Sequence, residues 1–151
     1  GFANHHFGTW QPQHAKSSLH ASRSFHPDIT VLPLWLTPAH SVQAAAYSLR
    51  HCPADAAVLM SYGHGNAPDD AALLQAVRDF TAAGKPLLNI SQVAHGCAAA
   101  VYAQGNALRQ SGAVQGGKCT IETATVLLML AVHHRWDAAQ IEQELQRLQL
   151  L

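Results

Sequence analysis

Charged residues are scarce in this sequence of 151 residues, where they make up 12% against a usual share of about 25% in soluble domains. Nine basic and nine acidic side chains balance, so no basic field exists to hold nucleic acid or an anionic membrane surface. Long hydrophobic runs are missing as well, since the longest apolar stretch, residues 124–132, is far below the roughly 20 residues of a membrane span. We therefore expect neither nucleic acid nor a membrane as partner, and a sparsely charged surface that another protein surface covers.

Cysteine is also rare, with three residues, Cys52, Cys97 and Cys119, that form no CxxC pair. The odd number of thiols, together with the absence of a signal-peptide pattern at Gly1, predicts a reducing, cytoplasmic compartment. The length suits one domain that buries its core without disulfides.

The common cofactor and metal motifs are absent. Gly63-x-Gly65 lacks the third glycine of a dinucleotide-binding loop, and no phosphate-binding P-loop is present. Ser61 lacks one of the two flanking glycines that a nucleophile elbow requires. The adjacent histidine pairs at residues 5–6 and 133–134 point their rings apart, and zinc-finger and HExxH spacings are missing. The sequence predicts no cofactor and no metal site.

Strands and helices alternate from residue 28 onward. Residues 1–27 show no periodicity and are expected to be a linker or the tail of a missing N-terminal domain, whereas residues 28–151 are expected to form one domain. Apolar runs predict strands at residues 29–36, 56–61 and 86–91. Apolar residues at helical spacing, together with residues that typically start or end helices, predict helices at 38–52, 69–83, 105–110, 120–134 and 137–148. This order predicts an α/β fold, a small three-layer domain with a mainly parallel, roughly four-stranded sheet flanked by helices.

Some residues mark the ends of these elements. Thr37, followed by a proline, is expected to cap the first helix, and Pro33 predicts that its strand lies at an edge of the sheet or at a bulge. Asp69 and Asp70 are expected to open the second helix, where negative charge suits the helix dipole. Asp137 and Gln140 predict a capping box for the last helix.

A candidate ligand site follows the second strand, because ligands of open α/β sheets bind at the carboxyl ends of the strands. The segment Ser61-Tyr62-Gly63-His64-Gly65-Asn66 is a glycine-rich turn whose backbone can turn sharply. Asn66 can bind a ligand with its amide, or Asn66 and the glycines can serve only to form the turn from strand to helix, where Asn66 could cap the next helix. The residues alone favour the purely structural role. The next loop pairs His95 with Cys97, a spacing that is more typical of a buried, inert thiol than of a catalytic pair.

Short motifs follow one another in a distinctive order between residues 27 and 135. They are Ser61-Tyr-Gly-x-Gly-Asn-Ala-Pro68, Asn89 with Ser91-Gln92, Gly96, Tyr102-Ala-x-Gly-Asn-Ala-Leu108, Gly112, Gly116-Gly117 and Thr120-x-Glu-x-Ala124. In this order they resemble the C-terminal domain of cytoplasmic, type I bacterial L-asparaginases. Residues 1–4 look like the remains of the segment that closes the N-terminal domain of that family, so the chain is expected to begin inside a larger protein.

The resemblance implies an amidohydrolase that converts L-asparagine and water to L-aspartate and ammonia. It also implies that the nucleophilic threonines lie in an N-terminal domain, so that no residue of this chain is catalytic and the chain alone is inactive. The C-terminal domain would form dimers, or dimers of dimers, and line the substrate pocket of a neighbouring subunit. Asn66 matches the substrate-binding asparagine of the family, with Ser61, Tyr62, Gly63 and Gly65 as its supporting turn.

Several positions depart from the family pattern. Residues 98–100 are alanines, so they supply no equivalent of the glutamate with which secreted relatives hold the amino group of the substrate. Met60 and Val93 stand where many bacterial members have arginine and cysteine, so an effector pocket of that kind is not expected. The alternative function is a free-standing, non-catalytic small-ligand-binding or regulatory α/β module that keeps the sheet and the Asn66 turn.

Overall fold

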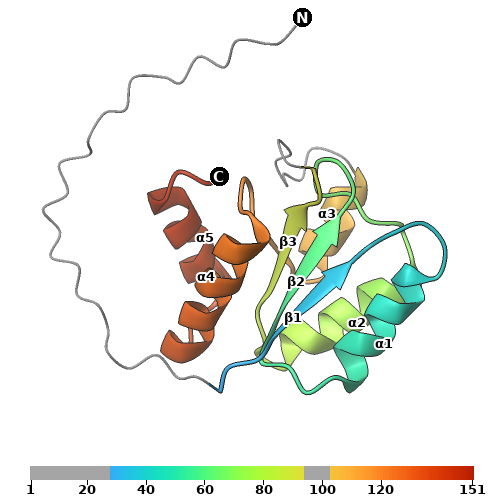
Figure 1. Cartoon of the computed structure of the whole chain (residues 1–151), viewed down its shortest axis with the longest axis horizontal. Helices are drawn as coiled ribbons and strands as arrows, with labels where there is room; N and C mark the ends of the chain where they lie inside the picture. Colours follow the sequence, from blue (N-terminus) through green and yellow to red (C-terminus); the bar gives the residue numbers. More distant parts are fainter. Residues whose placement is uncertain (1–27, 94–102) are drawn as a thin grey trace, which may run out of the picture.

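A four-stranded sheet forms the middle layer of the protein in a computed structural model, which describes residues 28–93 and 103–151 (Figure 1). The strands are β1 (Val31–Trp35), β2 (Ala56–Ser61), β3 (Leu87–Ser91) and β4 (Val114–Gln115). They lie in the order β1-β2-β3-β4 and are all parallel, with Val31 opposite Ala56, Ala57 opposite Leu87 and Leu88 opposite Val114. The predicted parallel sheet is confirmed, and Pro33 lies on the edge strand β1, where a missing N–H is tolerated.

Helices cover both faces of the sheet. They are α1 (Ser41–His51), α2 (Ala71–Ala82), α3 (Ala103–Gln110), α4 (Ile121–His134) and α5 (Ala138–Arg147). Right-handed crossovers between neighbouring parallel strands put the connecting helices on one face, where α1 and α2 pack. The opposite face is covered by α4 and α5, which follow the last strand (Figure 1). No helix of the described residues is long and apolar enough to cross a membrane.

The two faces of the sheet have separate cores, because successive side chains of a strand point to opposite sides. Ala57 and Leu59 pack against α1 and α2, whereas Val58 and Ile90 pack against α4 and α5. Every residue of β2 is buried, as a central strand of a parallel sheet requires.

The sequence signals at the later helices are confirmed. The Asp70 carboxylate accepts a hydrogen bond from the Leu73 N–H (2.9 Å) and caps α2. Gly84 follows the end of that helix with a left-handed backbone, at φ 77°. Asp137 and Gln140 exchange both bonds of the predicted capping box at the start of α5.

The prediction for the start of the first helix is wrong. α1 begins only at Ser41, and His40 before it makes no capping side-chain bond. Thr37 instead closes a turn with Ser41, whose hydroxyl accepts from the Thr37 N–H (2.7 Å) and donates to the Thr37 carbonyl. Ala39 has a left-handed backbone, at φ 78°, which interrupts the helical path between the two residues.

Two segments named in the sequence analysis lie outside the described residues. They are residues 1–27, expected as a linker or tail, and residues 94–102, which include His95, Cys97 and the three alanines at 98–100.

Candidate functional site

The glycine-rich turn after β2 is closed by its own main chain. The Tyr62 N–H donates to the Asn66 carbonyl (2.8 Å), and the Asn66 N–H donates to the Tyr62 carbonyl (2.9 Å). Gly63 and Gly65 have φ angles of 48° and 92°, which residues with a side chain adopt only at a cost. The structure therefore brings together the turn residues singled out in the sequence, and it places Asn66 at the carboxyl end of the sheet.

Below this turn, three buried side chains form a hydrogen-bonded chain across β2, β3 and β4. Ser61 and Asn89 are fully buried, and Gln115 is 7% exposed. The Ser61 hydroxyl donates to Asn89 Oδ1 (2.6 Å). Asn89 Nδ2 donates to Gln115 Oε1 (3.0 Å) and to the Gly65 carbonyl (2.9 Å). Because unpaired polar groups are costly in an apolar interior, this chain of bonds favours one position of the turn.

The two residues at and after the end of β3 also hold this edge of the sheet together. The Ser91 hydroxyl donates to the Gly63 carbonyl (2.5 Å). Gln92 Nε2 donates to the carbonyls of Leu36 and Met60, the latter at 2.7 Å. The carboxyl ends of β1, β2 and β3 and the turn are thus joined by side chains of one short segment.

Sequence reasoning assigned no role to Asn89 or Gln115. The signal for Asn89 is an asparagine inside the apolar run 86–91, since a polar side chain in a buried strand must find a partner. Gln115 carries no comparable signal, because its strand has only two residues.

Two side-chain atoms at this end of the sheet are buried without a hydrogen-bond partner among the described residues. They are Asn66 Oδ1 and Gln115 Nε2. Most buried polar atoms in folded proteins are paired, so each of these atoms needs an explanation. For Asn66, the main-chain bonds to Tyr62 fix the residue, while its buried side-chain carbonyl accepts no hydrogen bond from a described residue.

Asn66 forms the turn with its main chain, as the structural role requires, but it does not cap the next helix. α2 begins only at Ala71, and its cap is the Asp70 carboxylate. Because Asn66 does not cap the helix and its Oδ1 has no partner among the described residues, its amide stays a candidate for ligand binding.

No described side chain near the turn is arranged as a nucleophile. The Ser61 hydroxyl is fully buried and donates to an amide oxygen, which is not a general base. Cys119 is buried as well, and this burial raises the pKa of its thiol to about 11, so the thiol stays protonated at neutral pH. The described residues at this edge can bind and orient a ligand, and they supply no group that attacks one.

The histidines at the end of α4 stack on neighbouring rings. The expectation that the rings of His133 and His134 point apart is wrong, because the two rings lie edge to face with centroids 4.7 Å apart. His134 also stacks on Trp136, with centroids 5.6 Å apart. Within residues 28–93 and 103–151, no group of three or more His, Cys, Asp or Glu side chains could hold a metal ion. The histidine pair at residues 5–6 lies outside the described residues.

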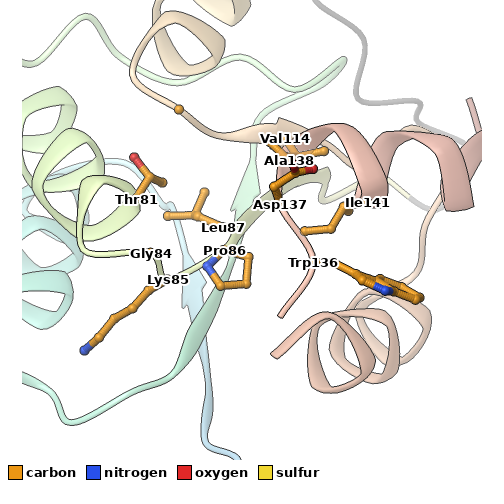
Figure 2. A pocket seen from close by; sticks show the side chains of 11 residues that line it. Thr81, Gly84, Lys85, Pro86, Leu87, Val114, Trp136, Asp137, Ala138 and Ile141 are labelled. Carbon is orange, nitrogen blue, oxygen red and sulfur yellow. The ribbon is translucent and has the colours of Figure 1, made fainter. Parts of the chain in front are cut away.

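A cavity of about 330 Å³ lies at the opposite end of the sheet, at the amino ends of β3 and β4 (Figure 2). Its walls are mainly apolar and include Leu87, Val114, Trp136 and Ile141. The polar side chains that line it are engaged: Asp137 caps α5, the Thr81 hydroxyl bonds to main-chain carbonyls, and the Lys85 ammonium lies over an aromatic ring. The candidate site therefore remains at the carboxyl end, around Asn66.

Residues 31–145 match the Glutaminase/Asparaginase C-terminal domain family. The chain belongs to this family. L-asparaginase 1 of Escherichia coli (strain K12) is 32% identical over 122 residues, which cover 78% of this chain and 36% of that protein. The chain therefore spans about a third of the length of the curated relatives that it matches.

Solved structures of the family share the fold. L-asparaginase I from Vibrio cholerae aligns with a TM-score of 0.67 at 24% identity, over 78% of this chain and 36% of that one. The thermostable L-asparaginase from Thermococcus kodakarensis aligns with a TM-score of 0.64 at 28% identity, over 76% and 34% of the two chains. The family predicted from the order of the motifs is confirmed, while the role of Asn66 stays a prediction.

Proposed function

We propose that this chain is the dimer-forming and substrate-lining C-terminal domain of an L-asparaginase, a hydrolase that converts L-asparagine to L-aspartate and ammonia. The observation that carries the proposal is the Asn66 turn, which holds an unpartnered amide carbonyl at the carboxyl end of the sheet. Support also comes from relatives that are named L-asparaginases and are about three times longer than the matched region. In this proposal the nucleophilic threonines lie in the N-terminal domain of the enzyme.

The amide of Asn66 suits the charged head of an amino acid. Its Oδ1 can accept from the ammonium group, and its Nδ2 can donate to the carboxylate. A hydrogen bond to a charged group contributes about 1.5–3 kcal/mol when it is formed in a site that excludes water. Binding of this kind holds the substrate for a nucleophile that another part of the enzyme supplies.

The proposal includes self-association, in a dimer or a dimer of dimers, and a cytoplasmic location. Four large hydrophobic side chains among the described residues are more than half exposed: Tyr47 (65%), Trp35 (59%), Val93 (54%) and Val126 (51%). A second protein surface would bury them favourably, which agrees with the low charge of the sequence. Light scattering on the 151-residue chain at micromolar concentration should report a dimer or a larger species, and a sharp monomer would count against this part of the proposal.

The test of function uses the 151-residue chain and a fusion protein, in which residues 28–151 replace the matched region of E. coli L-asparaginase 1. The chain alone should release no ammonia from L-asparagine above background, because the proposal places the nucleophilic threonines in the N-terminal domain. The fusion protein should release ammonia, and the E. coli enzyme without its matched region serves as the control.

Two results would contradict the proposal. Appreciable turnover by the purified chain would place a nucleophile within it. A fusion protein that folds and assembles but hydrolyses no asparagine would favour the alternative, a non-catalytic ligand-binding or regulatory module.

A further inference from the structure

Two side chains of β3 reach the turn that carries Asn66, and one of them bonds directly beside it. Asn89 Nδ2 donates to the Gly65 carbonyl at 2.9 Å. That carbonyl belongs to the peptide unit between Gly65 and Asn66, and the N–H of the same unit donates to the Tyr62 carbonyl at 2.9 Å. Since a peptide unit is planar, bonds at both of its ends fix the plane from which the Asn66 side chain departs.

Asn89 can make its bonds in only one orientation of its amide. Its Oδ1 accepts from the Ser61 hydroxyl (2.6 Å), while its Nδ2 donates to two oxygens, those of Gly65 and Gln115. Rotating the amide by a half-turn would set its oxygen against the Gly65 carbonyl, which can only accept, so this bond would be lost. The plane of the Gly65–Asn66 peptide is therefore specified by buried groups from three neighbouring strands.

We propose that Asn89 is a positioning residue for substrate binding, which fixes the Gly65–Asn66 peptide and so aims the Asn66 amide at the bound amino acid. Asn89 is fully buried, so it acts through Asn66 and does not touch the substrate itself. This inference rests on the proposed function, because it assumes that Asn66 binds the substrate.

The first arm of the test measures the turn alone, by amide hydrogen exchange of the Asn66 N–H in the 151-residue chain. Asn89→Asp keeps the oxygen that accepts from the Ser61 hydroxyl. It replaces the Nδ2 that donates to the Gly65 carbonyl by a second oxygen, which can only accept. Ser61→Ala is the milder variant, which removes the bond that orients Asn89 and the longer contact of the same hydroxyl with the Ile90 carbonyl (3.3 Å). Ser61→Ala should speed exchange by about three- to tenfold, the effect of losing one hydrogen bond on a local opening. Asn89→Asp should speed it at least as much, since both bonds that Asn89 Nδ2 donates are lost.

A matched control comes from another buried serine. Ser111 donates its hydroxyl to the Ala107 carbonyl (2.9 Å) at the end of α3, and it makes no bond to the turn. Ser111→Ala should leave the exchange of the Asn66 N–H unchanged. Unchanged exchange in both Asn89→Asp and Ser61→Ala would overturn the inference, whatever Asn66 does in the enzyme.

The second arm measures KM and kcat of the fusion protein. Asn89→Asp and Ser61→Ala should raise KM by about three- to tenfold and leave kcat per folded enzyme unchanged, whereas Ser111→Ala should change neither. If exchange is faster but KM does not rise, while Asn66→Ala does raise KM, the inference is wrong and the proposed function stands. If Asn66→Ala also leaves KM unchanged, the proposed role of Asn66 fails and the inference fails with it.

Discussion

Replacing Asp70 by alanine removes the oxygen that accepts a hydrogen bond from the Leu73 N–H at the start of α2. Loss of such a cap costs about 1 kcal/mol of the free energy of unfolding. For a folded domain of roughly 120 residues the entropy of unfolding is about 250 cal/mol/K, so Tm should fall by about 4 °C. Asn66→Ala should change the free energy of unfolding by less than about 0.5 kcal/mol, because Asn66 Oδ1 makes no bond among the described residues and its main-chain bonds remain.

Thermal unfolding of the 151-residue chain, followed by circular dichroism, measures both effects. Asp69→Ala is the matched control, since it removes the same charge from a neighbouring, exposed side chain. A Tm of Asn66→Ala as low as that of Asp70→Ala would refute the reasoning and return Asn66 to a structural role.

Three further predictions concern other parts of the molecule. In a Cys97→Ser background, a thiol reagent at pH 8 should modify the exposed Cys52 rapidly and the buried Cys119 only on unfolding; equal rates would contradict the burial of Cys119. The pKa of the Cys119 thiol is about 11 in the folded state and about 9 in the unfolded state, so the folded state keeps a proton that the unfolded state releases. Denaturant titrations should therefore show the free energy of unfolding falling from pH 9 to pH 11 more steeply than in Cys119→Ala, and parallel pH profiles would refute this. Gly84→Ala should cost about 1–2 kcal/mol of the free energy of unfolding, because alanine is strained in its left-handed backbone (φ 77°). The space around Gly84 is open, so no clash adds to this cost. Gly117→Ala should cost more in the same titration, because its new Cβ would lie 2.0 Å from the Leu150 carbonyl oxygen, and equal costs would contradict that packing.

Local signals in the sequence were sufficient where one short segment determines its own structure. The capping box of Asp137 and Gln140 closes its own helix end, and the apolar run 56–61 is buried from end to end as a central strand. The alternation of such segments was enough to predict the parallel sheet, because few topologies bury apolar strands on both faces.

Features that depend on distant residues could not be predicted in this way. β4 has only two residues, and it is a strand because Val114 and Gln115 lie beside β3. The start of α1 depends on the turn between Thr37 and Ser41, which competes with the expected cap.

The candidate site also combines a feature that one short segment determines with a feature that depends on distant residues. The glycine-rich turn was evident from its own residues, whereas the bond from Asn89 to the Gly65 carbonyl joins residues 24 positions apart. The sequence offers both Asn66 and an aspartate before α2 as residues that could cap this helix. Only the position of Ala71 as the first helical residue decides between them.

The central claim is that Asn66 binds the substrate of an L-asparaginase, and its most direct test is kcat/KM of the fusion protein with and without Asn66. The account predicts that Asn66→Ala lowers kcat/KM for L-asparagine by about ten- to a hundredfold, mainly through a higher KM, since a hydrogen bond to a charged group is lost. Asp70→Ala, which destabilises α2, should leave kcat/KM of the folded fusion protein unchanged. An Asn66→Ala fusion protein with the kcat/KM of its parent would contradict the claim.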